Sequence, residues 1–293
     1  MEHYPTTNRI PVNKYVLLFL YIFVIQIGLF GQQFANGFPA LLNQQPFFND
    51  TLIQKKGIHQ ITTSVMYKSP NEKIVFSAET AVFIFNKIGK VEKWEHTNRS
   101  GVLSSSQYYF SNKGYLATEH IISSNSNILK SYIYDENGMI TAIQKADATT
   151  AKTIQEDKFS YDVFSKFQYK KYWLNNENLT YKYTLVDVDK EGRKKEERTR
   201  FIRGASRETT YYTYHNGWLV SYAHNIKETT RREVKYQLEY SKNGNLLTMN
   251  ESIDGAQVTH YEYLYEGGLL IAILQKNINS QRIKITKFKY LFF

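Results

Sequence analysis

The chain has 293 residues, with 37 Lys and Arg against 27 Asp and Glu, and it contains no cysteine. The lack of cysteine excludes disulfides, thiolate metal sites and a lipid-modified N-terminal cysteine. The net charge of +10 favours acidic partners, and the 24 Tyr and 18 Phe provide a large aromatic surface.

The first segment has the pattern of an export signal. Arg9 and Lys14 precede an apolar run at 15–30, and Gly31 follows the run. A basic start, an apolar run and a small residue are typical of a secretory signal peptide. The run is shorter than the roughly 20 residues that span a bilayer, so a cleaved signal at 1–31 is favoured over an uncleaved anchor. We expect the chain to work outside the cytoplasm, in the periplasm, at the cell surface or secreted.

Residues 32–57 are rich in Gln, Asn and Gly, and we expect an irregular lead-in there rather than a separate domain. The remainder, 58–293, reads as one repeat domain. A turn ending in glycine recurs about every 25 residues, at Gly89, Gly114, Gly138, Gly192, Gly217, Gly244 and Gly268, with a degraded copy at 161–165. A fixed period in this range is typical of repeat architectures.

Each turn follows two positions that share one face of a strand. These pairs are Phe83/Phe85, Tyr108/Phe110, Tyr132/Tyr134, Phe159/Tyr161, Val186/Val188, Tyr212/Tyr214, Leu238/Tyr240 and Tyr263/Tyr265. Alternating aromatic positions are typical of half-buried strands, and no sustained helical period follows residue 31. The sequence predicts an all-β antiparallel meander of about eight two-stranded repeats. Because twisted open sheets beyond about ten strands curl or split, we expect a curled open sheet or partial β-shell, with the lysines of 283–290 guarding its open edge.

The pattern Y-x-Y-D-x-x-G-x-L, clearest from Tyr132 to Ile140, resembles the YD repeat of the RHS family. The resemblance covers residues 75–293 and keeps the Tyr and Gly framework, although Asp follows the second aromatic only at Asp135 and Asp162. It implies a curled β-shell. Members of the family can enclose a C-terminal toxin, but we identify neither a toxin tip nor the family's core motif here, so toxin delivery is not implied.

Catalytic and metal-binding patterns are not found. The histidines after the signal form neither H-x-H nor H-E-x-x-H, and the chain lacks a G-x-S-x-G elbow, a phosphate loop and a dinucleotide fingerprint. We therefore expect a protein that is not an enzyme and has no cofactor and no metal.

One candidate binding group is aromatic and consists of Tyr212, Tyr214 and Trp218, beside a single turn. Their rings suit sugar rings or apolar peptide. The alternative is a purely structural ladder, because cross-strand aromatic pairs stabilise sheets.

A second candidate group is basic and consists of Lys194, Arg198 and Arg200, within the base-rich run 190–207. Alternation predicts that the three share one strand face. Such a patch suits an acidic polysaccharide or an acidic protein, and the alternative is a solvated strand pair.

The sequence thus predicts an exported, non-enzymatic β-repeat protein that binds a protein partner or a neutral or acidic glycan. Export disfavours nucleic acid, and membrane contact is expected only through the signal segment. The alternative is an outer-membrane β-barrel, motivated by the strand count, the signal and the ending Leu291, Phe292 and Phe293. The polar character of both faces of 194–200 opposes it, because a lipid-facing strand needs one apolar face.

Overall fold

The computed structural model of the chain describes residues 48–175, 177–204, 206–227 and 231–293. The expected signal peptide at 1–31 lies outside these ranges, as does most of the expected lead-in. The described end of the lead-in is not irregular but forms the helix α2 (Asp50–Lys55), which the side chain of Asn49 caps by accepting from Leu52 N at 3.1 Å. No helix among the described residues has the length and apolar character needed to cross a membrane.

Eighteen strands follow α2 within the described residues. They are β1 (Ile58–Lys68), β2 (Val75–Phe85), β3 (Val91–Thr97), β4 (Leu103–Phe110), β5 (Leu116–Ser123), β6 (Ser126–Tyr134), β7 (Ile140–Asp147), β8 (Thr153–Ser165), β9 (Gln168–Leu174), β10 (Thr180–Val188), β11 (Lys194–Phe201), β12 (Arg207–His215), β13 (Trp218–Lys227), β14 (Arg231–Tyr240), β15 (Leu246–Ile253), β16 (Ala256–Glu266), β17 (Leu269–Asn277) and β18 (Ile283–Phe292). Each strand pairs antiparallel with the next, so the predicted all-β meander is confirmed.

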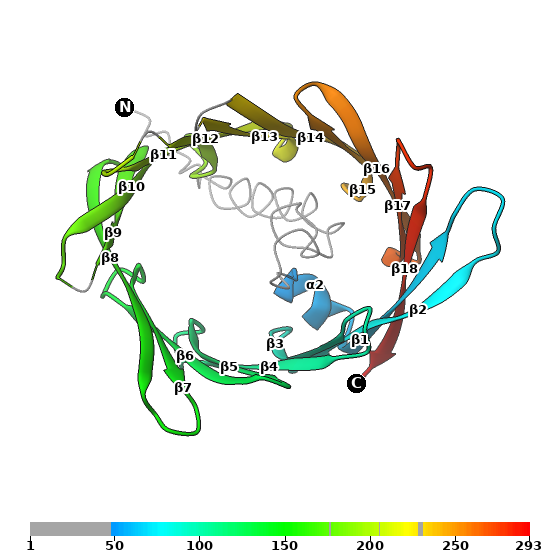
Figure 1. The fold of residues 1–293 in the computed structure, drawn as a ribbon, viewed down its shortest axis with the longest axis horizontal. Coiled ribbons are helices and arrows are strands. Elements are labelled where there is room, and N and C mark those ends of the chain that lie inside the picture. Colours follow the sequence, from blue (N-terminus) through cyan, green and yellow to red (C-terminus); the bar gives the residue numbers. More distant parts are fainter. Residues whose placement is uncertain (1–47, 176, 205, 228–230) are drawn as a thin grey trace, which may run out of the picture.

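The sheet is closed, which makes the expected open curled sheet wrong. Strand β1 pairs antiparallel with β18, from Ile58 opposite Phe292 to Lys68 opposite Ile283, and Figure 1 shows the resulting ring. Strand β18 is therefore not an edge strand, and the expectation that its lysines protect an open edge is also wrong. The chain forms an 18-stranded β-barrel, in which closure satisfies the backbone groups that an open edge would expose.

Helix α2 identifies the inner face of the barrel, because Figure 1 shows it inside the ring. Phe48, just before α2, packs edge-on against Phe83 and Phe85 at ring-centroid distances of 4.9 Å. Phe83 lies opposite Ile61 on β1 and opposite Trp94 on β3. Residues that lie opposite each other on neighbouring strands share a face of the sheet. Following these pairs from strand to strand therefore identifies the inward residues of the whole ring, and every aromatic pair before a turn points into the lumen.

The hydrophobic core of the described residues lies between α2 and the strands β1, β2 and β14–β18. Its least exposed side chains are Phe85, Ile53, Ile58, Ile61, Met249 and Leu270, each no more than 1% exposed. These residues come from both ends of the chain. Burial of this apolar surface therefore helps to hold the barrel closed.

Two of the turn glycines lie under aromatic side chains of the preceding repeat. Trp218 stacks on Tyr240 at 5.5 Å, and a Cβ added to Gly244 would lie 2.4 Å from the indole ring. Tyr115 covers Gly138 in the same way, with its hydroxyl 2.5 Å from an added Cβ. Glycine is required at these positions for close packing as well as for a positive φ.

The second aromatic position of the repeat often links it to the preceding repeat. In four repeats a Tyr hydroxyl donates a hydrogen bond to a backbone carbonyl of the repeat before. The pairs are Tyr134 with Leu116 at 2.9 Å, Tyr161 with Ile140 at 2.9 Å, Tyr240 with Leu219 at 2.8 Å and Tyr290 with Leu270 at 2.6 Å. These carbonyls follow the turn of the repeat before, so the tyrosines join adjacent hairpins along the ring. A phenylalanine at this position could pack but could not make this hydrogen bond.

Candidate functional site

The lumen is lined by aromatic rings among which carboxylates are paired. Four inward glutamates each accept a hydrogen bond from a Tyr hydroxyl. The pairs are Tyr67 with Glu79 at 2.6 Å, Tyr132 with Glu119 at 3.0 Å, Tyr212 with Glu197 at 2.5 Å and Tyr236 with Glu251 at 2.9 Å. Three of these glutamates also meet a lysine at 2.8 Å: Lys284 at Glu79, Lys130 at Glu119 and Lys194 at Glu197. Burial and the neighbouring Glu197 raise the pKa of Tyr212 far above its usual value. A carboxylate beside apolar surface needs such partners, because an unpaired charge there is costly.

The wall formed by β8–β10 places a lysine among aromatic rings. The Lys171 ammonium lies 3.9 Å from the ring centroid of Phe159 and 4.8 Å from that of Trp173. Burial, followed by the charges of Lys194 and Lys182, lowers the pKa of Lys171 to about 8. Part of the lumen wall is therefore both aromatic and basic, and it suits a ligand with ring faces and negative charge.

The outer face of the barrel is polar around the whole ring. One outward residue from each strand illustrates this: Thr62, Thr80, Lys93, Gln107, His120, Ser131, Gln144, Lys158, Lys170, Asp187, Arg198, Thr209, Asn225, Gln237, Asn250, Glu262, Lys276 and Lys287. Apolar outward residues also occur. Tyr109, Ile133 and Leu264 near the glycine turns are 54%, 42% and 42% exposed, and Leu103 and Ile122 near the opposite rim are 56% and 40% exposed. Aromatic rings thus lie mainly inside the barrel, whereas every strand carries polar residues on its outer face.

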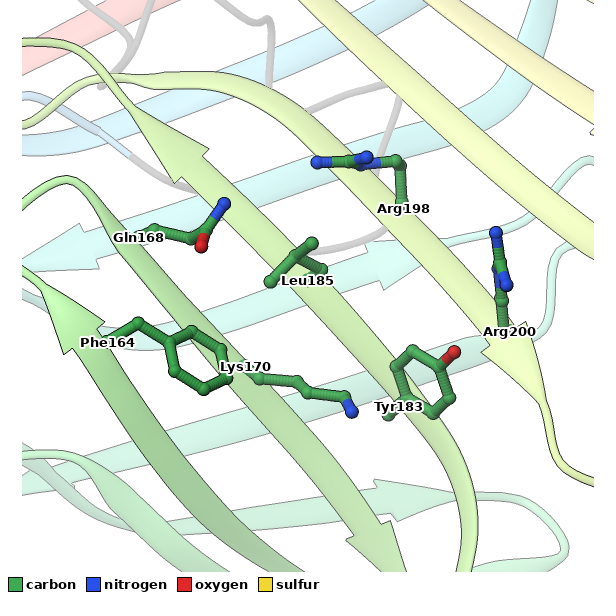
Figure 2. Close-up of a pocket in the computed structure, with 7 residues that line it drawn as sticks. All are labelled: Phe164, Gln168, Lys170, Tyr183, Leu185, Arg198 and Arg200. Carbon is green, nitrogen blue, oxygen red and sulfur yellow. The ribbon is translucent and has the colours of Figure 1, made fainter.

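A cup on the outer face holds part of the basic group predicted from the sequence. Its volume is about 370 Å³, and Figure 2 shows the side chains that line it: Phe164, Gln168, Lys170, Tyr183, Leu185, Arg198 and Arg200. The Lys170 ammonium lies 4.1 Å from the ring centroid of Tyr183. Arg198 Nη2 donates to Asp187 at 2.7 Å, so part of the positive charge is already balanced.

Lys194 does not share a face with Arg198 and Arg200, and the expectation that it would is wrong. A β-bulge in β11 places Glu196 opposite Asp187 but Lys194 opposite Val188, so one extra residue shifts the alternation. The Lys194 ammonium pairs with the inward Glu197 at 2.8 Å. The two arginines point outward, whereas Lys194 points into the lumen.

The aromatic group is also divided. Tyr212 and Tyr214 lie on the lumen side of β12, and the Arg193 guanidinium sits 4.6 Å from the ring centroid of Tyr214. Trp218 lies instead at the rim, where it covers Gly244. The structure therefore places the six predicted residues in three separate surroundings.

The sequence does not assign Lys171 or the inward glutamates to a site, and it offers Trp173 only as the anchor of a local pocket. Glu119, Glu197 and Lys171 lie at inward positions that the register of the sheet identifies. As for metals, no three His, Asp or Glu side chains come together in a way that could hold an ion within the described parts of the chain.

Comparison with known proteins finds no matching family model and no matching curated protein. A porin-like protein from Bacteroides uniformis is similar over 80% of this chain and 97% of its own, with 9% identity and a TM-score of 0.42. The TcdB2–TccC3 structure is similar over 76% of this chain and 15% of its own, with 12% identity and a TM-score of 0.33. A LolA superfamily protein from Nitrosomonas europaea is similar over 80% of this chain and 84% of its own, with 6% identity and a TM-score of 0.19.

Proposed function

We propose that this protein is a water-exposed β-barrel that binds a ligand in its aromatic lumen, outside the cytoplasm and without catalysis. The observation that carries the proposal is the polarity of the two faces. A membrane-spanning barrel presents an apolar band about 25 Å tall to lipid and has a polar interior. Here polar or charged residues lie on the outer face of every strand, and aromatic rings line much of the lumen.

The outer face argues against lipid contact on energetic grounds. A Lys or Arg on the lipid face at the bilayer midplane costs roughly 2–4 kcal/mol. Outward ion pairs such as Lys93 with Glu95 at 2.7 Å and Arg198 with Asp187 at 2.7 Å lie within strands rather than in turns. Several such charges around the ring oppose insertion, whereas in water they cost little.

A barrel in the outer membrane is the second candidate, and specific observations favour it. The sheet closes, its strands are 7–13 residues long, and Tyr109, Ile133 and Leu264 are exposed apolar residues on the outer face. Transmembrane strands of about 9–11 residues are of similar length. Charged residues such as Lys93 and Arg198 interrupt the apolar surface within the strands.

The ligand class follows from the lining. Rings of Phe159, Trp173 and Tyr212 face the lumen, and flat apolar faces pack well on them. A glycan or an apolar peptide segment has the matching surface. The signal-like segment at 1–31 supports a place in the cell envelope, and the RHS-like repeat pattern supports a shell.

The proposal can be tested by titrating the purified full chain, without detergent, with N-phenyl-1-naphthylamine. This neutral aromatic probe brightens when it is enclosed by apolar surface. We expect saturable binding, and we expect Trp173→Ala in the lumen to weaken it about three- to tenfold, since a stacked aromatic contact contributes about 0.5–1.5 kcal/mol.

Tyr211→Ala is the matched control, because Tyr211 is an outward aromatic residue that is 47% exposed. It should leave probe binding unchanged. Equal weakening by both substitutions, or no saturable binding by the folded protein, would contradict a lumen site.

A further inference from the structure

A second cavity lies in the lumen wall, apart from the outer cup. It has a volume of about 410 Å³ and is bounded by β1–β3 and β16–β18. Its lining includes Trp94, His96, Tyr263, Gln275, Glu79 and Arg99. Pockets of about 300–1,000 Å³ hold small organic ligands, so one or two sugar-sized rings fit this space.

Three polar atoms in this lining have no hydrogen-bond partner among the described residues. They are Trp94 Nε1, His96 Nδ1 and the Tyr263 hydroxyl, and each is buried. Tyr263 as a whole is only 3% exposed. A buried polar group without a partner is costly, and an apolar guest would leave all three unpaired. A guest with hydroxyl groups could both donate to and accept from them.

The same wall carries a stack of aromatic rings. Trp94 and His96 are stacked with ring centroids 4.7 Å apart and an angle of 19° between their planes. Phe83 lies parallel to Trp94, at 5°. The C–H face of a sugar ring can pack on a free face at the end of such a stack, while its hydroxyls reach the polar atoms around it.

The charge near the cavity is positive. Glu79 is neutralised by Lys284 at 2.8 Å. The guanidinium groups of Arg99 and Arg282 lie 5.1 and 4.6 Å from the ring centroid of Tyr67, and no ion pair joins either of them to a carboxylate of the described residues. Both arginines also line an adjoining cavity of about 250 Å³ together with Glu72, which pairs with neither.

We propose that this cavity binds an acidic sugar, with the ring on the stack of Trp94 and His96 and the carboxylate at Arg99. The inference rests on the proposed ligand-binding lumen and names its ligand class. Arginine binds carboxylates through two parallel hydrogen bonds. Among chemical classes, a hexuronate combines the ring face, the hydroxyls and the negative charge that this cavity matches.

The test uses the full chain with Trp173→Phe and Trp218→Phe, so that Trp94 is the remaining tryptophan and its fluorescence reports on the cavity. Sodium glucuronate should change that fluorescence saturably. Glucose, which lacks the carboxylate, should bind about ten- to a hundredfold more weakly, as expected for loss of a charge-assisted hydrogen bond. Arg99→Gln should remove most of this difference between the two sugars.

Tyr263→Phe separates binding from folding. Removing an unpaired buried hydroxyl should leave stability unchanged or raise it, yet weaken glucuronate binding about three- to tenfold. Tyr134→Phe is the control, because its hydroxyl is bonded to the Leu116 carbonyl on another part of the ring. It should lower stability and leave binding unchanged.

Three results would overturn the assignment: no saturable response to glucuronate, an equal response to glucose, or tighter binding of adenosine monophosphate than of glucuronate. If the naphthylamine probe still binds in those cases, the acidic sugar is excluded while the lumen site stands. If the probe also fails to bind, the proposed function fails as well.

Discussion

Gly244→Ala is expected to lower the free energy of unfolding by about 2–5 kcal/mol. A left-handed backbone costs a non-glycine residue roughly 1–2 kcal/mol, and forcing atoms into packed space costs about 1–3 kcal/mol more. Both apply here, because the φ of Gly244 is +78° and an added Cβ would lie 2.4 Å from two ring carbons of Trp218. Urea unfolding followed by circular dichroism measures the loss.

Gly192→Ala isolates the contribution of packing. Gly192 has the same φ of +78°, but nothing lies within 4 Å of an added Cβ. Only the backbone strain of roughly 1–2 kcal/mol should appear. If the two variants lose the same stability, the packing of Trp218 over Gly244 contributes nothing measurable.

Lys130→Met is expected to destabilise the barrel by about 3–5 kcal/mol, the usual cost of leaving a buried charge without its partner. Glu119 is only 3% exposed and meets the Lys130 ammonium at 2.8 Å. Its remaining side-chain partner would be the Tyr132 hydroxyl at 3.0 Å. Adding Glu119→Gln to the same chain should recover much of the loss, because the amide carries no charge.

Lys93→Met is the matched control on the outer face. Lys93 pairs with Glu95 at 2.7 Å, but both side chains are about a third exposed. Exposed pairs contribute about 0–1 kcal/mol, so this loss should be small. A loss as large as that of Lys130→Met would mean that the outer face is not in water.

The repeat could be predicted from the sequence because its signal is local. The glycine spacing and the aromatic pairs before each turn come from residues within one hairpin, and they indicate the strands and their shared face. Closure is not local. It depends on β1, which precedes the first glycine turn, pairing with β18 more than 200 residues later. The lysines of 283–290 are compatible with an edge strand, and only the register shows that Lys287 and Lys289 project outward from a fully paired strand.

The candidate site was less predictable, because it depends on register and on one irregularity. Alternation predicts that Lys194 and Arg198 share a face, but the bulge in β11 separates them. Nothing in the sequence marks a bulge at that point. The cavity beside Trp94 joins residues of β3 to residues of β16 and β18, which are neighbours only because the barrel closes.

The central claim is that the outer face lies in water, and thiol accessibility tests it most directly. The chain has no cysteine, so Gln144→Cys, Gln237→Cys and Glu262→Cys each give a single thiol at an exposed outward position on a different part of the ring. Full-length protein in a bacterial cell extract would be treated with a membrane-impermeant maleimide. We expect all three thiols to react fully without detergent. Thiols that are protected until detergent is added would show that lipid covers the strands, and the outer-membrane barrel would replace the present account.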